Sequence, residues 1–123
     1  MVRFIIFFLS LKILALTGCS ISGGCENIVI KSTASTDGKF VATLYSRNCG
    51  ATSDLAYIVH LRASEDRFDP DASSSYVFVT TSREPLDVEW KGEGLLNIGN
   101  VAEDLELVFN QQHKWKDVRI HYN

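Results

Sequence analysis

Apolar residues recur at every second position along most of the chain from Asn27 onward, which is the period of a half-buried β-strand rather than of a helix. Residues 86–91 show the pattern most clearly, because Leu86, Val88 and Trp90 alternate with three charged residues. One face of such a strand is buried and the other is solvated. The same alternation predicts further strands in residues 28–31, 40–46, 55–62, 76–81, 95–99, 105–109 and 118–122.

Turn residues separate these segments at short intervals. Asp37-Gly38 lies between two alternating runs and predicts a tight hairpin, because glycine accepts the positive φ that such a turn requires. Residues 91–94 predict a second hairpin, and residues 101–109 could hold a helical turn instead of a strand. We therefore expect an all-β domain of about seven antiparallel strands, folded as a small sandwich or as a partly open barrel.

The beginning of the chain has a different pattern. Arg3 is followed by an almost wholly apolar run, residues 4–16, and then by the small residues Thr17 and Gly18. A charged start, an apolar middle and small residues before a cleavage point are typical of a secretory signal peptide. A membrane-spanning helix needs about 20 apolar residues. Because this run is shorter and contains Lys12, a permanent transmembrane anchor is the weaker alternative.

The residues Leu16-Thr17-Gly18-Cys19 resemble the lipobox of bacterial lipoproteins. The resemblance implies that the Cys19 sulfur receives a diacylglyceryl group, that cleavage before Cys19 removes residues 1–18, and that the new amino group is acylated. Residues 19–24 would then be the lipidated start and a short tether, and residues 25–123 the all-β domain. A signal-peptide cysteine that carries no lipid is the alternative.

Lipid on Cys19 would make a membrane the first partner of this protein. Each buried methylene group contributes about 0.8 kcal/mol, so two or three acyl chains hold a small domain durably on a bilayer. In the lipoprotein class, a serine after the cysteine, here Ser20, usually accompanies sorting to the outer membrane. The resemblance thus implies a cell-envelope protein that faces the periplasm.

The charge balance bears on the choice of partner. The whole chain carries a net charge of −3, and loss of Arg3 and Lys12 with the leader makes the mature chain −5. Binding to nucleic acid is driven by clusters of lysine and arginine, and the sequence contains none. We therefore expect no nucleic-acid partner.

Two cysteines remain once Cys19 is assigned to lipid. An even pair in an oxidising compartment favours one disulfide between Cys25 and Cys49, which by chain entropy contributes about 3 to 4 kcal/mol. Metal binding by this pair is the alternative, although two distant thiols cannot complete a tetrahedral site alone.

The body of the chain has two further resemblances. Cys49-Gly50-Ala51-Thr52, preceded by the Asp37-Gly38 turn, is similar to a motif in small secreted bacterial proteins without an assigned function. This resemblance implies a disulfide-bonded domain outside the cytoplasm. The turn and the segment from Trp90 to Leu96 are similar to parts of TolB-like β-propeller blades. We attribute that likeness to shared hairpin geometry.

Two loops carry backbone or side-chain groups that could bind ions. Gly50, in residues 48–54, could let backbone N–H groups converge on an anion, or could only connect two strands beside the crosslink. The carboxylates of Asp66, Asp69 and Asp71 could bind calcium, but their spacing fits no known calcium loop. We expect the loop of residues 63–75 to be a solvated acidic loop.

The histidines are the remaining candidates for catalysis. His60 and His121 alternate with apolar residues on expected strands, so we expect both to face water or a sheet edge, and nothing local holds them near His113. No nucleophile motif is recognisable. We therefore expect no catalytic residue, no cofactor and no metal, and a hydrolytic or metal-assisted enzyme is the less favoured hypothesis.

Trp115 differs from Trp90, Phe109, Tyr122 and Tyr76, which alternate with polar residues in expected strands, because it has no apolar neighbours in the sequence and lysines flank it. Exposed aromatic residues are common anchors of protein interfaces, so Trp115 is a candidate partner contact. The sequence as a whole predicts an envelope lipoprotein with a binding or structural role. A periplasmic inhibitor or an immunity protein against a hydrolase is a narrower hypothesis of the same kind, resting on analogy.

Overall fold

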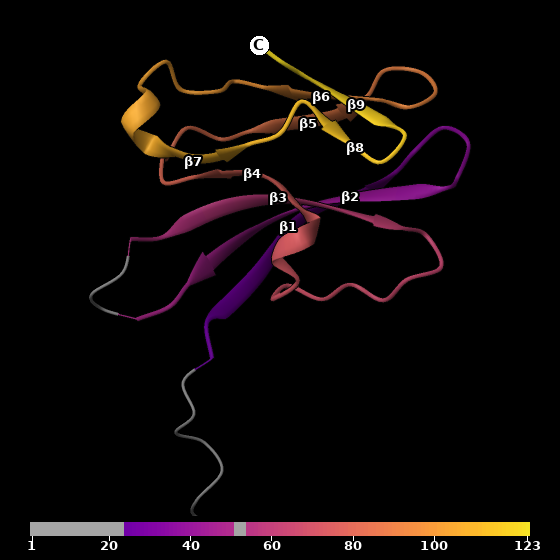
Figure 1. The fold of residues 1–123 in the computed structure, drawn as a ribbon. Helices are drawn as coiled ribbons and strands as arrows, with labels where there is room; N and C mark the ends of the chain where they lie inside the picture. Colours follow the sequence, from indigo (N-terminus) through magenta and orange to yellow (C-terminus); the bar gives the residue numbers. More distant parts are fainter. Residues whose placement is uncertain (1–23, 51–53) are drawn as a thin grey trace, which may run out of the picture.

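The chain forms a sandwich of two β-sheets in a computed structural model that describes residues 24–50 and 54–123 (Figure 1). The sheets do not close on each other, so of the two expected architectures the sandwich is confirmed and the barrel is not. The expected signal peptide, the lipid site at Cys19 and Ser20, and loop residues 51–53 lie outside the described residues.

The larger sheet is antiparallel throughout and has the strand order β1-β2-β3-β4-β7. Its strands are β1 (Glu26–Ala34), β2 (Phe40–Asn48), β3 (Ala56–Ala63), β4 (Tyr76–Thr80) and β7 (Val108–Gln111). The first four lie beside one another in chain order, each antiparallel to the strand before it. Among the described residues, β1 pairs with β2 alone and is therefore an edge strand.

The smaller sheet has the order β5-β6-β9-β8. Its strands are β5 (Asp87–Trp90), β6 (Leu95–Gly99), β9 (Val118–Tyr122) and β8 (Lys114–Trp115). Strands β6 and β9 run parallel, which departs from the expectation of a wholly antiparallel domain. The cause is the long connection between them, which adds β7 to the larger sheet before the chain returns.

The strand predicted over residues 105–109 begins one turn later than expected. The 3-10 helix η5 (Leu105–Leu107) comes first, and β7 follows it. The Asp104 carboxylate accepts a hydrogen bond from the Glu106 N–H at 3.0 Å, which caps this turn. With the two-residue strand β8, the described residues contain nine strands rather than about seven.

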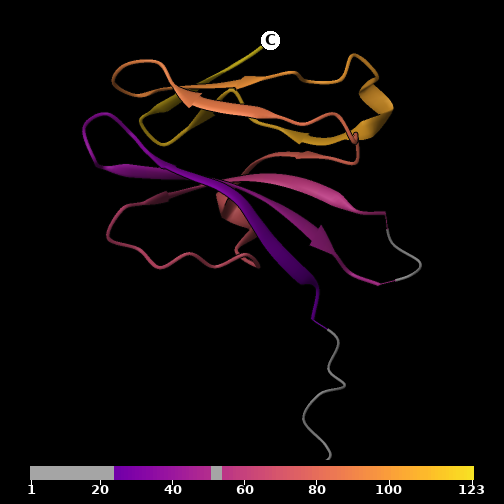
Figure 2. The same ribbon diagram turned by 180° about the vertical axis from the view of Figure 1, so that it is seen from behind.

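The main core lies between the inner faces of the two sheets. Its fully buried members include Val59 and Leu61 of the larger sheet and Leu96 and Ile98 of the smaller sheet. The Trp90 indole packs against this core and donates its Nε1–H to the Thr33 carbonyl at 3.0 Å. That bond joins β5 to β1 across the sandwich, and Figure 2 shows these layers from behind.

The two predicted hairpins are present. Gly38 has φ of 74°, and the Asp37 carboxylate accepts hydrogen bonds from the Ser35 hydroxyl at 2.6 Å and the Lys39 N–H at 3.0 Å. These hydrogen bonds lower the pKa of Asp37. In the second hairpin, the Lys91 N–H donates to the Leu95 carbonyl at 2.8 Å. Both turns therefore follow from the local sequence.

The helical segments of the described chain are short 3-10 turns, and none of them could span a membrane.

Candidate functional site

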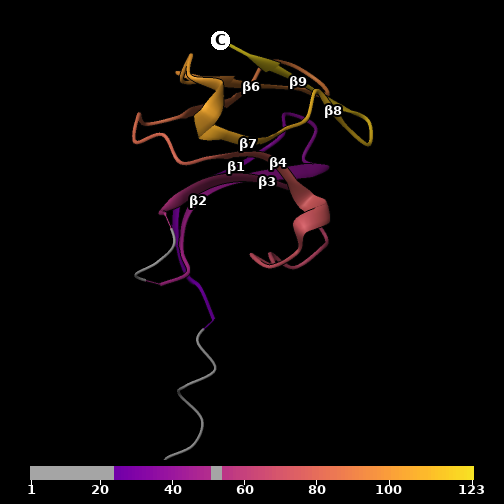
Figure 3. The ribbon, with the colours of Figure 1, turned by 60° about the vertical axis from the view of Figure 1, so that its left-hand side comes forward.

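The loop of residues 64–75 folds back across the outer face of the larger sheet, on the side away from the smaller sheet (Figure 3). Strands β2 and β3 are therefore buried on both faces: Leu44 and Val59 face the main core, while Tyr45 and His60 lie beneath the loop. The carboxylates of this loop are exposed, as expected, but the loop also packs Phe68 against the sheet, which was not expected. We call Tyr45, Ile58, His60, Phe68 and Tyr76 the outer cluster.

His60 lies in this cluster and is only 1% exposed, so the expectation that it faces water is wrong. Its ring centroid lies 4.9 Å from that of Phe68, in an edge-to-face arrangement. Its Nε2 lies 3.1 Å from the Asp69 carbonyl oxygen. Burial lowers the pKa of His60, and the charge of Arg62 lowers it further, whereas the hydrogen bond to Asp69 acts in the opposite direction. His60 is therefore a neutral imidazole near pH 7.

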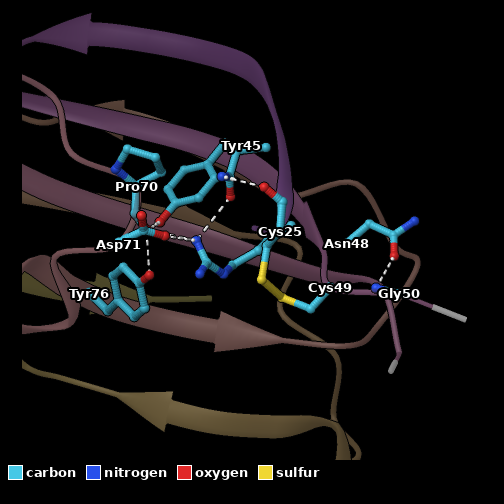
Figure 4. Close-up of a disulfide and its surroundings, with 10 residues drawn as sticks. Cys25, Tyr45, Asn48, Cys49, Gly50, Pro70, Asp71 and Tyr76 are labelled. Atoms are coloured by element: carbon cyan, nitrogen blue, oxygen red, sulfur yellow. Dashed lines mark hydrogen bonds and ion pairs between the residues drawn. A yellow bond between two sulfur atoms is a disulfide. The ribbon is translucent and has the colours of Figure 1, made fainter. Parts of the chain in front are cut away.

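The Pro70 carbonyl oxygen holds the middle of the loop against the sheet. It accepts hydrogen bonds from the Tyr45 hydroxyl at 2.9 Å, from Arg47 Nη1 at 3.1 Å and from the Tyr76 hydroxyl (Figure 4). Arg47 Nη1 also lies 2.8 Å from a carboxylate oxygen of Asp71. Desolvation raises the pKa of Tyr45, so its hydroxyl stays protonated and remains a donor.

A polar cavity of about 350 Å³ opens beside the outer cluster. It lies between β3, the loop and the β8–β9 turn, and it is lined by His60, Arg62, Asp66, Arg67, Asp69, Ala72, Ser74, Ser75, Trp115 and Lys116. Two of the lining residues each have a buried side-chain atom without a hydrogen-bond partner among the described residues, His60 Nδ1 and Arg62 Nε. These atoms have almost no accessible surface, and the Arg62 guanidinium is held by the loop, because its Nη1 donates to the Asp66 carbonyl at 2.7 Å.

The structure separates the other ion-binding candidates. Asp71 pairs with Arg47, whereas Asp66 and Asp69 line the polar cavity, so the three loop carboxylates do not converge. His121 Nδ1 lies 2.9 Å from Asn97 Oδ1 in the smaller sheet. Within residues 24–50 and 54–123, no group of three histidine, cysteine or carboxylate side chains is placed to hold a metal ion.

Trp115 lies at the rim of the polar cavity and is half-buried. Its ring contacts Phe40 edge-on with centroids 5.9 Å apart, and its Nε1–H donates to the Ser74 carbonyl at 3.2 Å. Lys116 Nζ lies 4.7 Å from the ring centroid. Trp115 has no apolar neighbour along the chain, but the fold places it against Phe40. Its role as a partner contact stays a prediction.

The disulfide expected between Cys25 and Cys49 is present, with Cα atoms 4.1 Å apart (Figure 4). It joins the residue before β1 to the residue after β2, at the end of the larger sheet where the described chain begins. The Gly50 N–H donates to Asn48 Oδ1 at 3.0 Å. The Asn48 side chain therefore already accepts the hydrogen bond of the N–H group that an anion-binding loop would use.

The edge strand β1 carries three consecutive exposed aliphatic residues. Ile28, Val29 and Ile30 are 56%, 51% and 54% exposed. A bulge lies between Val29 and Lys31, which places Ile30 on the inner side of the sheet, beyond the cover of the smaller sheet. An apolar cavity of about 230 Å³ follows, lined by Ile30, Leu44, Tyr57, Arg83, Pro85 and Leu86.

Comparison with known proteins adds no relative: no protein-family model, curated protein or solved structure matches this chain significantly.

Sequence reasoning treated His60, Asp69 and Trp115 as unrelated candidates, and the fold brings all three to one cavity. Sequence reasoning did not single out Arg62, which lines the same cavity once the chain is folded. One sequence signal could have indicated the outer cluster. Phe68 is the only aromatic residue in an otherwise polar loop, and a loop that carries one large apolar side chain often packs it against the domain.

Proposed function

We propose that this protein is a lipid-anchored binding protein of the bacterial envelope, held on the membrane through Cys19 and without catalytic activity. The observation that carries the binding role is the exposed apolar edge of β1 beside an apolar cavity. The lipobox resemblance of Leu16 to Cys19 supports the anchor, and the Cys25–Cys49 disulfide supports an oxidising compartment.

The proposed anchor constrains where the domain sits. Six residue steps separate Cys19 from Cys25, so the tether reaches at most about 20 Å. The disulfide end of the larger sheet would therefore stay near the bilayer. The exposed residues Ile28, Val29 and Ile30 follow Cys25 closely on β1, so they would lie near the membrane surface. Other proteins of the envelope could contact them there.

The partner proposed for the β1 edge is an extended segment of a basic envelope protein. An edge strand offers main-chain donors and acceptors to an added strand, and the apolar cavity offers a place for one of its side chains. The mature chain carries a net charge of −5, which favours a positively charged partner and opposes binding to anionic lipid.

The anchor is tested by mass spectrometry of the native protein. The expected product begins at Cys19 and carries acyl chains, and Cys19→Ala should yield an unprocessed or released chain. A native product that lacks lipid and keeps residues 1–18 would contradict the proposed anchor.

The binding surface is tested by photo-crosslinking in intact cells. A photoreactive amino acid at Ile28 should give a product with another protein, and the linked peptide should come from an extended segment with net positive charge. The same amino acid at Arg119, exposed on β9, is the matched control and should give no such product.

The identity of the linked chain separates the alternatives. Val29→Lys should abolish the product by placing a charge on the apolar edge. A hydrolase as the linked chain would favour the inhibitor hypothesis. A second copy of this protein, a lipid adduct, or equal products from Ile28 and Arg119 would contradict the proposed partner.

A further inference from the structure

We propose that the loop of residues 64–75 is an acid-released cover, which detaches from the outer face of the larger sheet when His60 takes up a proton. This inference goes beyond the proposed function, because it concerns the face of the sheet opposite the apolar cavity and does not depend on the lipid anchor. It starts from the position of His60, which is only 1% exposed and lies beneath this loop (Figure 3).

The surroundings of His60 suit the neutral imidazole and not the imidazolium ion. The Asp69 carbonyl oxygen can only accept, so the hydrogen of the neutral ring is on Nε2, 3.1 Å away. Protonation adds a second N–H at Nδ1, which is buried and has no hydrogen-bond partner among the described residues. A buried donor without an acceptor is costly, and an unpaired buried charge is costlier still. Protonation therefore favours a conformation in which water reaches Nδ1.

The groups around His60 come from every element that packs against it, and none of them is a hydrogen-bond partner of Nδ1. They are Tyr45 and Arg47 of β2, Arg62 of β3, Asp66, Arg67, Asp69 and Asp71 of the loop, Tyr76 of β4, and Lys116 of the β8–β9 turn. Burial lowers the pKa of His60 and outweighs the hydrogen bond to Asp69. Tyrosine, arginine and lysine titrate well above pH 7, and carboxylates mostly below pH 5. Between these limits, His60 is the group of this set that changes its charge.

The loop can leave the sheet without breaking the pairing of any strand. In the part of the chain that the structure describes, the backbone N–H groups of residues 67–75 make no hydrogen bond to a strand. Side chains of the sheet hold the loop instead by donating to its carbonyl oxygens. Arg62 donates to Asp66 at 2.7 Å, and the hydroxyls of Tyr45 and Tyr76 donate to Pro70. Water can replace each of these contacts, so release is a local change.

Release uncovers an aromatic surface on the sheet. The ring centroids of Tyr45 and Tyr76 lie 6.3 Å and 6.4 Å from that of His60, and all three side chains lie beneath the loop. Aromatic side chains with a polar group are enriched at protein interfaces. The loop would therefore cover a possible contact face near neutral pH and expose it in acid.

Linkage between protonation and release sets the size of the effect. In the released loop, a solvated His60 has its ordinary pKa of 6.5. Lowering the pH from 7.5 to 5.5 then raises the equilibrium constant for release by at most about tenfold. The rise approaches this limit when the pKa of the covered His60 lies well below 5.5. We expect a rise of about threefold to tenfold.

The test is limited digestion of the full-length protein in detergent with thermolysin, which cleaves before large apolar residues. The rate of cleavage before Phe68 is divided by the rate for a free peptide of residues 64–75 under the same conditions, so that the ratio follows the released fraction. This ratio should rise about threefold to tenfold from pH 7.5 to pH 5.5.

Urea separates release of the loop from unfolding of the domain. Release exposes little surface, so the ratio should change little between 0 and about 1 M urea, whereas cleavage through complete unfolding would rise at least about fivefold. A ratio that rises as steeply with urea as the unfolded fraction does would overturn the proposal, because the loop would then leave the sheet only when the whole domain unfolds.

Two variants connect the acid response to His60. His60→Gln stays neutral and should lose the rise, whereas His121→Gln removes an exposed histidine of β9 and should keep it. If His60→Gln does not fold, the pH profile of the parent is the second test. The ratio should be level above about pH 7.5 and rise below pH 6.5, as one histidine requires. The proposal is overturned if the ratio of the parent does not change with pH, if its rise begins elsewhere, or if folded His60→Gln retains it.

Discussion

The imidazole of His60 lies edge-on against the phenyl ring of Phe68, with ring centroids 4.9 Å apart. This contact joins the middle strand of the larger sheet to a loop that is otherwise polar. Beside it, the Asp69 and Pro70 carbonyls accept hydrogen bonds from side chains of the sheet. The contact therefore supports the outer cluster and one wall of the polar cavity.

Replacement of Phe68 tests whether the loop is held by this packing. Phe68→Ala should lower the free energy of unfolding by about 2 kcal/mol, because it removes a half-buried ring from the outer cluster. It should also raise the pKa of His60 toward its ordinary value, since water would reach the imidazole. Urea unfolding and NMR titration measure the two effects. Phe109→Ala removes a ring that is 66% exposed, and it should change the free energy of unfolding little.

The buried His60 also predicts how stability depends on pH. Its pKa is lowered from 6.5 in the folded state, so below pH 6.5 the unfolded chain binds a proton that the folded chain does not. The free energy of unfolding should be constant above about pH 7.5 and should fall as the pH drops from 6.5 toward the lower folded pKa.

Urea unfolding at a series of pH values down to about 5 measures this slope, before most carboxylates titrate. His60→Gln should remove the part of the slope that comes from His60, and the exposed His121→Gln should retain it. An unchanged slope in His60→Gln would mean that other groups cause the dependence.

The alternating pattern sufficed to predict the central strands of the larger sheet, because β2 and β3 each have an alternating apolar face that is buried in the main core. It could not predict that β6 and β9 run parallel, since local alternation contains no information on the direction of a distant partner. It also could not predict β8, because two residues are too short for any periodicity.

The candidate site was predictable only in part. Alternation assigned His60 correctly to the face opposite Val59 and Leu61, but it predicted that this face is solvated because the apolar residues Tyr57, Val59 and Leu61 lie on the other one. The structure buries it through hydrogen bonds to backbone carbonyls of the loop, and any sequence can provide those. By contrast, the pairing of Cys25 with Cys49 could be predicted, because assigning Cys19 to lipid leaves only these two of the three cysteines.

The disulfide is expected to supply a large part of the stability. It closes a loop across a sequence separation of 24 residues, so replacing both Cys25 and Cys49 with serine should lower the free energy of unfolding by about 3 kcal/mol. Urea unfolding of the double variant measures the loss, and treatment of the parent protein with a reductant should reproduce it. A parent protein that is equally stable after complete reduction would contradict this contribution.

Substitution of Trp115 separates a structural role from a role in binding. Trp115→Ala should lower the free energy of unfolding by about 2 kcal/mol, because it removes the contact with Phe40 and the hydrogen bond to the Ser74 carbonyl. Trp115→Phe should cost only about 1 kcal/mol, because an aromatic ring remains against Phe40. Thermal unfolding measures both losses. Lys116→Ala removes the ammonium group near the ring and should lower the free energy of unfolding by about 0.5 kcal/mol.

Binding is measured separately from stability. If a partner contacts Trp115, it should bind the folded Trp115→Phe variant more weakly than the parent, although the two proteins differ little in stability. If Trp115→Ala is as stable as the parent, the ring is an independent surface group, as its sequence neighbours suggest.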